Sequence, residues 1–279
     1  GDESGYSVGE SQQTKLAAME AMWHTEPAPA SFNVIAWPNE AEMKNDWAIE
    51  VPWVMGLIGT RSVSKEIPGI HDIMAANRAR IVSGQQAVVA LDKLRINRGD
   101  TAAQAQLKAH QADLGFGLLL KKYTDDVAQA TPAMIDAAAR DTIPKVAPMF
   151  WSFRIMVALG MAMLGLFGWA LWSSVRGSFA ANRRLLKFAL YSLPLPWVAC
   201  EVGWFVAEYG RQPWTIYGVL PTRLSVSTLS EASLYGSLAG FVGFYTVLLC
   251  AEMYLMVRFA RQGPGSLGTG RYANEAPAH

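Results

Sequence analysis

Three long apolar runs dominate the second half of this sequence. A bilayer core of ~30 Å needs about 20 predominantly apolar residues in a helix to cross it. Each run meets that length, and each contains a single charged residue. Buried helices of a large soluble protein are the alternative, but three such runs in succession favour membrane spans. The runs extend over Ala147 to Trp172 (charged residue Arg154), Phe188 to Ala207 (Glu201) and Leu234 to Val257 (Glu252).

The first 145 residues differ from this second half, because charged side chains are scattered through them and no long apolar run occurs. Breaks rich in Pro and Asn separate segments in which apolar residues recur at helical spacing. One of these segments opens on Thr131-Pro132, an N-cap followed by Pro at the first helical position. We therefore expect a mainly helical, water-facing region. The predicted helices are Ser11 to Trp23, His71 to Leu94, Thr101 to Lys122 and Thr131 to Arg140.

Composition supports the membrane interpretation and excludes one class of partner. Hydrophobic residues make up 51% of the chain and charged residues 17%, where soluble domains carry about 25% charged residues. The formal net charge is +1, and no run of Lys and Arg of the kind that binds nucleic acid occurs. We expect no nucleic-acid partner.

The predicted fold is an all-α integral membrane protein, with three transmembrane helices preceded by a large, mainly helical extramembrane loop region. The predicted boundaries are residues 1–145 for that region and 146–174, 186–207 and 233–258 for the spans. Residues 208–232 then form a loop between the last two spans, and residues 259–279 form a tail.

The positive-inside rule orients the chain, because cytoplasmic loops carry an excess of Lys and Arg. The loop between the first two spans and the C-terminal tail are both basic, whereas the loop at 208–232 carries only Arg211 and Arg223. We predict a cytoplasmic tail and an N-terminal region outside, which in a bacterium is the periplasm. The cytoplasmic basic residues are Arg176, Arg183, Arg184 and Lys187 in the loop and Arg258, Arg261 and Arg271 in the tail.

Ionisable side chains inside a span are costly, at about 2.5–3.5 kcal/mol each on insertion scales, and are candidates for function. At 100° per residue, Trp204, Glu208 and Arg211 fall within about 80° of Glu201, so all four share one stripe. That stripe must face protein, water or a cofactor. An ion pair between Glu208 and Arg211, three residues apart at a helix end, is the simpler interpretation. In the first span, Arg154 lies on the same outer side of the membrane as Glu208 and Arg211.

Several stretches together resemble one family. They resemble subunit I of cytochrome bd-type ubiquinol oxidases. The stretches are GDESGY at the start, TKLAAMEAMW, VAPMFWSFRIMV, PLPWVACEVGWFVAEYGRQPW, and RFARQGPGSLGTGRY near the end. The resemblance covers the quinol loop and the last three membrane helices of that subunit. It implies a quinol:oxygen oxidoreductase of the bacterial inner membrane, a terminal oxidase of the respiratory chain that oxidises ubiquinol or menaquinol and reduces dioxygen to water.

The resemblance assigns a quinol site early in the loop. A Lys and a Glu of the family that bind or oxidise quinol match Lys15 and Glu20, and Asp2 lies in a stretch that resembles the same site. On a helix Lys15 and Glu20 are about 140° apart, so they would flank a ligand rather than pair. A carboxylate there can accept a proton from the quinol, and an ammonium can hold the developing anion. A solvated helix face is the alternative interpretation.

The resemblance also implies haem contacts. Met156, in the sequence FRIM, matches the axial ligand of the low-spin haem b, and a thioether suits such iron; a gap-filling methionine is the alternative. Glu208 matches an axial ligand of the high-spin haem b, close to the oxygen-reducing haem d or third haem b. Arg154 and Arg211 resemble residues that contact haem propionates. Trp204 would lie between haems, and Glu201 is a weaker candidate for handling protons.

The chain departs from the family in one respect. Its histidines are His24, His71, His110 and His279, and none lies in a predicted span, so the family's histidine ligands are missing. We expect a fragment of a longer protein, inactive without the N-terminal half of subunit I, and working with subunit II, small accessory subunits and membrane lipid. A fragment of a transporter with a polar path along its charged stripe, or a membrane-anchored interaction module, are the alternatives from other classes.

Overall fold

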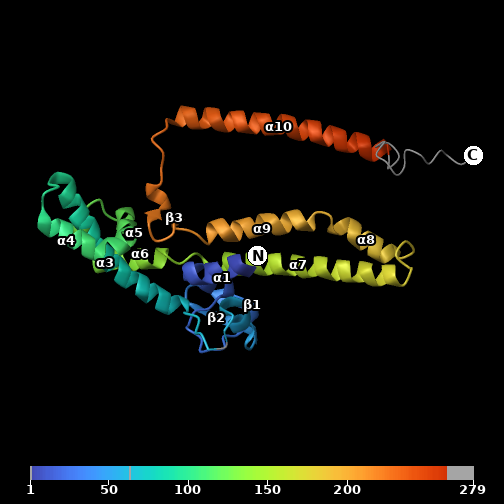
Figure 1. Ribbon diagram of the computed structural model, residues 1–279, viewed down its shortest axis with the longest axis horizontal. Helices are drawn as coiled ribbons and strands as arrows, with labels where there is room; N and C mark the ends of the chain where they lie inside the picture. The colour runs from blue at the N-terminus through green and yellow to red at the C-terminus, as the bar shows by residue number, and fades with distance from the viewer. Residues whose placement is uncertain (1, 63, 263–279) are drawn as a thin grey trace, which may run out of the picture. The chain divides into compact units, whose positions relative to one another are not determined.

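The apolar runs form long helices in the computed structural model, which describes residues 2–62 and 64–262 (Figure 1). Helix α7 spans Val146–Val175, and helix α10 spans Glu231–Gln262. Three helical segments are long and apolar enough to cross a membrane, at Pro132–Val175, Arg183–Tyr209 and Glu231–Arg261. The prediction of a mainly helical protein with three membrane-spanning helices is confirmed.

Helix α7 is longer than a bilayer core requires. Its 30 residues extend for about 45 Å at 1.5 Å per residue, against a core of ~30 Å. Its first turns, with Val146, Met149 and Phe150, are buried against the polar region, whereas most large apolar side chains beyond Arg154 are exposed. The exposed apolar part of α7 therefore begins close to Arg154.

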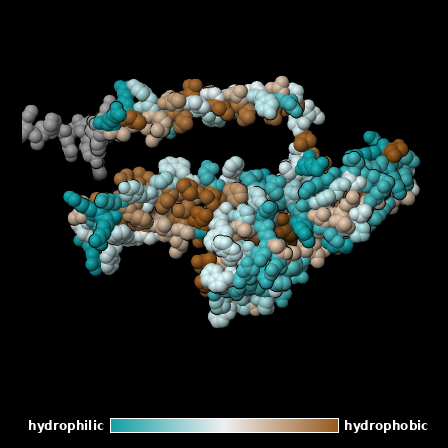
Figure 2. All heavy atoms as spheres, turned by 180° about the vertical axis from the view of Figure 1, so that it is seen from behind, coloured by the Kyte–Doolittle hydropathy of each residue, from teal (hydrophilic) through white to brown (hydrophobic). Residues whose placement is uncertain are grey.

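The second span is broken by proline. Helix α8 ends at Ser192 and α9 runs from Leu195 to Tyr209, with Pro194 between them and Pro196 in the first turn of α9. Proline lacks the N–H that would continue the helix, which explains the break. Asn182 caps α8, which begins at Arg183, by accepting a hydrogen bond from the backbone N–H of Leu185. Figure 2 shows apolar side chains gathered along α7 and α9.

The chain divides into two units, residues up to Ser225 and residues from Val226 onward, and α10 is the only helix described in the second. The first unit begins with α1 (Asp2–Ser11) and α2 (Gln13–Glu20), where the sequence predicted one helix from Ser11 to Trp23. Helix α2 ends at Ala21, whose φ of 50° lies in the left-handed region.

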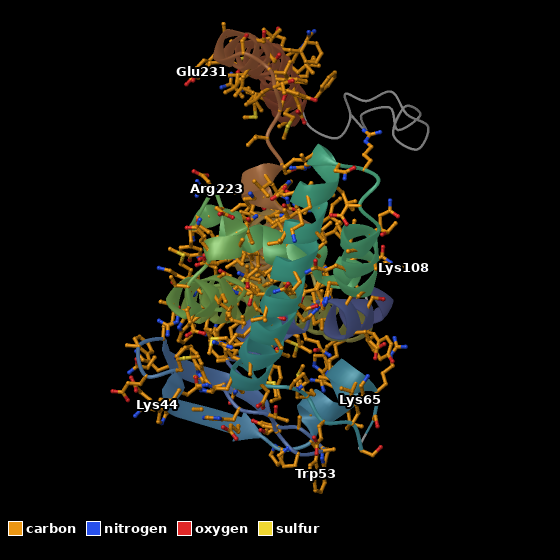
Figure 3. The ribbon with its side chains drawn as sticks, turned by 90° about the vertical axis from the view of Figure 1, so that its left-hand side faces the viewer. Lys44, Trp53, Lys65, Lys108, Arg223 and Glu231 are labelled. Atoms are coloured by element: carbon orange, nitrogen blue, oxygen red, sulfur yellow. The ribbon has the colours of Figure 1, made fainter. Side chains whose placement is uncertain are left out.

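An antiparallel hairpin that the sequence analysis did not predict follows α2. It pairs β1 (Phe32–Asn39) with β2 (Lys44–Val51), and Trp37 lies opposite Trp47. Pro38 and Asn39 end β1 and residues 40–43 form the turn, where the Asn39 side chain accepts hydrogen bonds from the N–H groups of Ala41 and Glu42. Figure 3 shows Lys44 at the start of β2 and Trp53, just after it, pointing outward.

Helix α3 (Ile70–Ile96) organises the rest of the polar region. It crosses α5 so closely that a Cβ on Gly84 would lie 2.1 Å from the carbonyl oxygen of Asp113, so only glycine fits. Asp100 and Thr131 cap α4 and α6 through their side chains. The remaining elements are η1 (Gly56–Thr60), α4 (Thr101–His110), η2 (Gln111–Asp113), α5 (Leu114–Leu118), η3 (Leu119–Lys122), η4 (Val127–Gln129), α6 (Pro132–Asp141), β3 (Trp214–Ile216), β4 (Leu220–Pro221) and η5 (Thr222–Leu224).

Two apolar cores hold this unit together. One core lies around α2 and joins it to the hairpin, to the first turns of α7 and to the last turns of α9, through Ala17, Ala18, Met149, Phe150 and Val206. The other lies around α3, α5 and α6 and includes Phe116 and Trp214, whose rings pack 5.0 Å apart. The first core fixes α2 at the ends of two membrane-spanning helices, and this is where the candidate site is found.

Candidate functional site

Helix α2 packs closely against α7 and α9 because its alanines are small. Ala17 and Ala18 are completely buried, and Lys15 and Glu20 are only 7% and 2% exposed. This burial excludes a solvated helix face for the two predicted quinol-site residues. The two side chains also leave α2 in different directions, since Glu20 contacts α7 and Lys15 contacts α9.

Glu20 forms a buried ion pair with Arg154 of α7. The Nη2 atom of Arg154 lies 2.6 Å from Oε2 of Glu20, and the two side chains are 10% and 3% exposed. The Nη1 atom is 3.5 Å from Oε1, so the second oxygen of Glu20 is held more loosely. The pair joins a residue expected at the quinol site to one expected at a haem.

Arg154 is also held by the hairpin. Its Nε donates to the backbone carbonyls of Asn33 at 2.9 Å and Val34 at 3.1 Å, and Nη2 donates to Asn33 as well. The rings of Phe32 and Phe150 each lie 4.4 Å from the guanidinium carbon, a cation–π arrangement. The Asn33 side chain in turn donates to the backbone carbonyl of Glu20 at 2.8 Å. Hairpin, α2 and α7 thus meet at one guanidinium.

Burial decides the protonation chemistry of Glu20. Removal from water disfavours the carboxylate and raises the pKa of Glu20, and the hydrogen bond and positive charge of Arg154 oppose that rise. A carboxyl group with a raised pKa is a stronger proton acceptor than a solvated one. The arrangement suits a group that takes up a proton.

Lys15 is bound to the end of α9. Its ammonium donates to the carbonyl of Ala207 at 3.1 Å, close to the negative end of the helix dipole. Burial lowers the pKa of Lys15, the positive charge of Arg211 lowers it further, and the negative charge of Glu208 opposes both. Lys15 therefore lies within electrostatic reach of the two charged residues predicted to contact haem.

Glu208 and Arg211 form the ion pair that their spacing suggested, at the C-terminal end of α9. Their side chains are 43% and 38% exposed. The Nε–H of Arg211 is nevertheless buried and has no hydrogen-bond partner among the described residues. A buried, unsatisfied donor is costly, so this N–H is available to an acceptor from outside the chain.

Met156 lies where α7 packs on α9. A Cβ on Gly203 would lie 3.0 Å from the sulfur of Met156, so the thioether rests against a gap that glycine leaves. Trp204 is 66% exposed, and Glu201 is also exposed. Asp2 opens α1, but its side chain lies outside the described part. The structure thus pairs Glu20 with Arg154, places Lys15 near Glu208 and Arg211, and leaves Glu201 and Trp204 on an open helix face.

The donor set on α7 and α9 is chemically compatible with haem. A thioether and a carboxylate can each bind iron, and the free Nε–H of Arg211 suits a haem propionate. No group of three or more His, Cys, Asp or Glu that could hold a metal ion occurs in the described residues.

The sequence analysis missed some residues of the site. Asn33 is 3% exposed and links Glu20 to Arg154, but no strand was predicted around it. Gly210 was not singled out either, although a Cβ there would lie 2.5 Å from Met149 and 2.9 Å from Lys15. A lone Asn and a lone Gly carry no signal in a single sequence, because only tertiary contacts give them a role.

Comparisons with known proteins agree on one family. A family model described as cytochrome bd terminal oxidase subunit I matches residues 1–264. The chain is 43% identical over 267 residues to cytochrome bd-II ubiquinol oxidase subunit 1 of Escherichia coli (strain K12), covering 96% of this chain and 52% of the relative. It is 25% identical over 255 residues to cytochrome bd ubiquinol oxidase subunit 1 of Bacillus subtilis (strain 168), covering 91% of this chain and 42% of the relative.

A solved structure shows the same fold. The bd oxidase from Geobacillus thermodenitrificans superposes with a TM-score of 0.57 at 20% identity, over 94% of this chain and 45% of the other. The chain spans about half the length of the relatives it matches.

Proposed function

Because this chain belongs to the cytochrome bd terminal oxidase subunit I family, we propose that it is part of a respiratory oxidase that oxidises quinol and reduces dioxygen to water. The chain would supply the quinol site and haem contacts, and it would act together with the rest of subunit I, subunit II and small accessory subunits. Ubiquinol or menaquinol would be the electron donor. The bacterial inner membrane would hold the complex, with the polar region in the periplasm and the tail at 259–279 in the cytoplasm.

One observation carries this proposal. Helix α2, with Lys15 and Glu20, is tied by both side chains to the outer ends of the two helices that carry Met156 and Glu208. A site that removes protons and electrons from quinol needs proton acceptors close to the electron acceptors. The packing of α2 against α7 and α9 meets that requirement within a single chain.

Quinol oxidation releases two protons and two electrons, and Glu20 would take up one of the protons. Glu20 would accept a hydroxyl proton at Oε1, the oxygen that Arg154 holds more loosely. Lys15 would stabilise the phenolate that forms, as an ammonium does for a developing oxyanion. Arg154 would keep Glu20 oriented and ionised before each turnover, which makes it a positioning residue.

The haems, when bound, supply one-electron carriers and the site of oxygen reduction. Met156 would hold the low-spin haem b, and Glu208 the high-spin haem b, with haem d or a third haem b completing the set. Arg211 would bind a propionate through its free N–H, and Trp204 would lie against a haem edge. Since Arg154 is already bound by Glu20 and the hairpin, we place it between quinol and haem, and its predicted contact with a haem stays a prediction.

A redox spectrum of the intact oxidase tests the haem assignment. We expect Met156→Leu to remove the low-spin b-type band from the reduced-minus-oxidised spectrum and to leave the other bands. Met161→Leu is the matched control, because Met161 lies on the same helix and is 62% exposed. An unchanged low-spin band would remove Met156 from the site. If the unmutated complex had no haem signal, the oxidase proposal would fail and a transport or anchoring role would stand.

A second measurement isolates the quinol site. In Glu20→Gln we expect dithionite to reduce the haems fully and quinol to reduce them slowly, because only the second reaction needs the proton acceptor. Glu10→Gln is the control, since Glu10 forms an exposed ion pair with Lys65. Equal rates of reduction by quinol in both variants would show that Glu20 does not take part.

A further inference from the structure

An unused hydrogen-bond acceptor lies beside the buried ion pair of Glu20 and Arg154. It is Oδ1 of Asn33, on β1, which is buried and has no hydrogen-bond partner among the described residues. Asn33 as a whole is 3% exposed. Its backbone carbonyl binds Arg154 and its Nδ2 binds Glu20, so Oδ1 alone is left without a role. Buried polar atoms without a partner are rare, and each one calls for an explanation.

The hydrogen bonds of Asn33 fix which way its side chain points. Nδ2 donates to the backbone carbonyl of Glu20 at 2.8 Å. A carbonyl accepts only from the nitrogen of a carboxamide, so Oδ1 takes the other position of that group. The Asn33 carbonyl and Oε2 of Glu20 also share one donor, Nη2 of Arg154, and two acceptors of one nitrogen lie within about 6 Å of each other. Asn33 is thus bound to Glu20 twice, once directly and once through Arg154.

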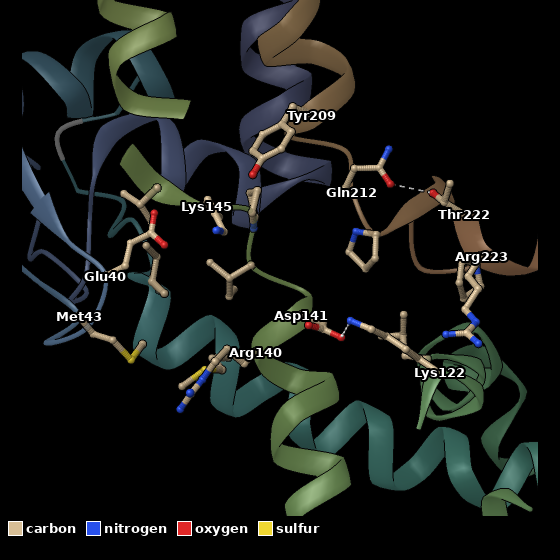
Figure 4. Close-up of a pocket in the computed structure, with 18 of the residues that line it drawn as sticks. Glu40, Met43, Lys122, Arg140, Asp141, Lys145, Tyr209, Gln212, Thr222 and Arg223 are labelled. Carbon is tan, nitrogen blue, oxygen red and sulfur yellow. Dashed lines mark hydrogen bonds and ion pairs between the residues drawn. The ribbon is translucent and has the colours of Figure 1, made fainter. Parts of the chain in front are cut away.

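The cavity of about 670 Å³ in this unit does not provide a partner for Oδ1. Residues of α3, α6, α7 and α9 line it, and Figure 4 shows Asp141 and Tyr209 at its border. Neither Asn33 nor Glu20 lines it. The two residues face the packed core around α2 instead, which points to a partner inside the ion-pair site.

Protonation of Glu20 creates the missing donor. An ionised carboxylate only accepts hydrogen bonds, whereas a protonated carboxyl has one O–H to donate. Glu20 is 2% exposed, so this O–H needs an acceptor from the protein. Two side-chain oxygens in the described part are buried without a partner, on Gln12 and Asn33, and Asn33 is the one bonded to Glu20.

We propose that Oδ1 of Asn33 accepts the hydrogen bond of protonated Glu20, which makes Asn33 a positioning residue for the proton that quinol gives up. The inference rests on the proposed function and deepens it at the same site. When Glu20 is ionised, it faces the lone pairs of an unpaired oxygen, and when it is protonated, it gains a hydrogen bond. Both effects favour the protonated form, as does burial, which raises the pKa of Glu20.

The charged surroundings of Glu20 leave this hydrogen bond as the variable that a change at Asn33 would alter. Arg154 is the charged group that acts on the pKa of Glu20, and it opposes the rise. Titratable groups on the other elements around α2 have different partners or are exposed. They include Lys15 on α2, bound to Ala207; Glu10 on α1, paired with Lys65; His71 on α3, stacked on His24; Glu208 on α9, paired with Arg211; and Glu50 on β2, exposed opposite Asn33.

Infrared spectroscopy of the intact oxidase tests the proposal without quinol. The C=O stretching band of protonated Glu20 is assigned by its loss in Glu20→Gln and followed as pH changes. We expect Asn33→Leu to move the midpoint of this band to lower pH and its frequency upward, because the O–H loses its acceptor. Asn33→Asp should move the midpoint to higher pH, since it places a second carboxylate beside Glu20. Loosened packing alone does not produce opposite shifts at one position.

Asn45 provides a matched control. It lies on β2 and makes the same kind of bond to the next residue of the chain, donating to the carbonyl of Ala21 at 3.0 Å, but its Oδ1 already accepts from Trp23 at 2.9 Å. Asn45→Leu should leave the midpoint unchanged. Haem reduction by quinol should slow about 2- to 10-fold in Asn33→Leu, the net contribution of one hydrogen bond, and should keep its rate in Asn45→Leu.

Three results would each overturn the proposal: unchanged midpoints in both Asn33 variants, an equal shift in Asn45→Leu, or no carboxyl band lost in Glu20→Gln. An unchanged haem spectrum shows that each variant is assembled, and Asn33→Asp keeps the test available if Asn33→Leu does not assemble. The quinol role fails separately. Normal reduction by quinol in Glu20→Gln, with shifted midpoints in the Asn33 variants, would refute that role and keep the hydrogen bond.

Discussion

Removing Arg154 should make the stability of the oxidase depend on pH in a way that removing Glu20 does not. Arg154→Met takes away the cation but keeps an aliphatic side chain between Phe32 and Phe150. It leaves the Glu20 carboxyl buried at 2% exposure without its partner. Glu20→Gln does the reverse, because it leaves the buried guanidinium of Arg154 without a carboxylate to face.

The expected magnitude follows from the burial of the pair. Breaking a buried ion pair by removing one partner costs about 3–5 kcal/mol. Glu20 can avoid part of this cost by binding a proton, because burial already raises its pKa and Arg154 opposes that rise. Loss of Arg154 removes that opposition, so the pKa of Glu20 should rise further.

The sign of the effect can be stated. A carboxyl whose pKa is raised in the folded state stabilises the fold below its unfolded pKa, near 4.5, and this contribution is lost as pH rises through the folded pKa. Arg154→Met moves that upper limit to higher pH. Between about pH 5 and pH 8, the variant should therefore lose stability as pH rises, because a smaller share of Glu20 carries a proton. The guanidinium left by Glu20→Gln cannot lose its proton, so its loss of stability should be independent of pH.

Thermal unfolding of the intact oxidase, followed by haem absorbance across that pH range, measures the effect. Arg176→Met is the matched control, because Arg176 is an exposed cation just past the other end of α7, stacked on Trp172. Its midpoint should follow that of the unmutated protein. Parallel loss of stability in Arg154→Met and Glu20→Gln at every pH would refute the argument from a titrating, buried Glu20.

Two further predictions concern α2 and its contacts. Lys15→Met should lower kcat/KM for quinol by about 100-fold, the cost of one lost donor to a developing oxyanion, yet leave the thermal midpoint unchanged or raised. Burial lowers the pKa of Lys15, so the charged ammonium is unfavourable in the fold, and the fold gains stability as pH rises from that lowered pKa toward the unfolded value of 10.5. Lys15→Arg should restore part of the rate. Gly210→Ala should lower the stability of the fold by about 1–3 kcal/mol, because its Cβ would overpack Met149 and Lys15. Gly165→Ala is the control, since no described atom lies within 4 Å of a Cβ there, and it should leave the stability unchanged. Circular dichroism melts would show whether the two variants differ.

The long helices could be predicted because their signal is local. A run such as Ala147 to Trp172 is apolar and long enough to cross a bilayer as a helix. Pro194 marks the break in the second span. The hairpin at Phe32–Val51 could not be predicted in the same way. The Pro38-Asn39 break lies at the end of β1, next to the turn. Trp37 on β1 and Trp47 and Ile49 on β2 are exposed, so no alternation of buried and solvated residues identified the strands.

The site itself was predicted residue by residue through resemblance, but its connections were not. Helix geometry indicated only that Lys15 and Glu20 point in different directions. Tertiary packing decides that Lys15 reaches Ala207 and that Glu20 reaches Arg154, since Glu20 and Arg154 are 134 positions apart. The hairpin that completes the pair through Asn33 was absent from the prediction as well.

These connections change the meaning of Arg154. The resemblance assigned it to a haem, and the structure places its guanidinium on the carboxylate predicted to accept the quinol proton. Protonation of Glu20 during quinol oxidation would remove the negative charge that Arg154 faces, two residues before Met156 on the same helix. An uncompensated cation raises the reduction potential of a nearby iron. We expect each proton taken up by Glu20 to favour electron transfer toward Met156, so the low-spin potential in Glu20→Gln should be higher than in the unmutated oxidase, and an unchanged potential would show that the two sites are not coupled.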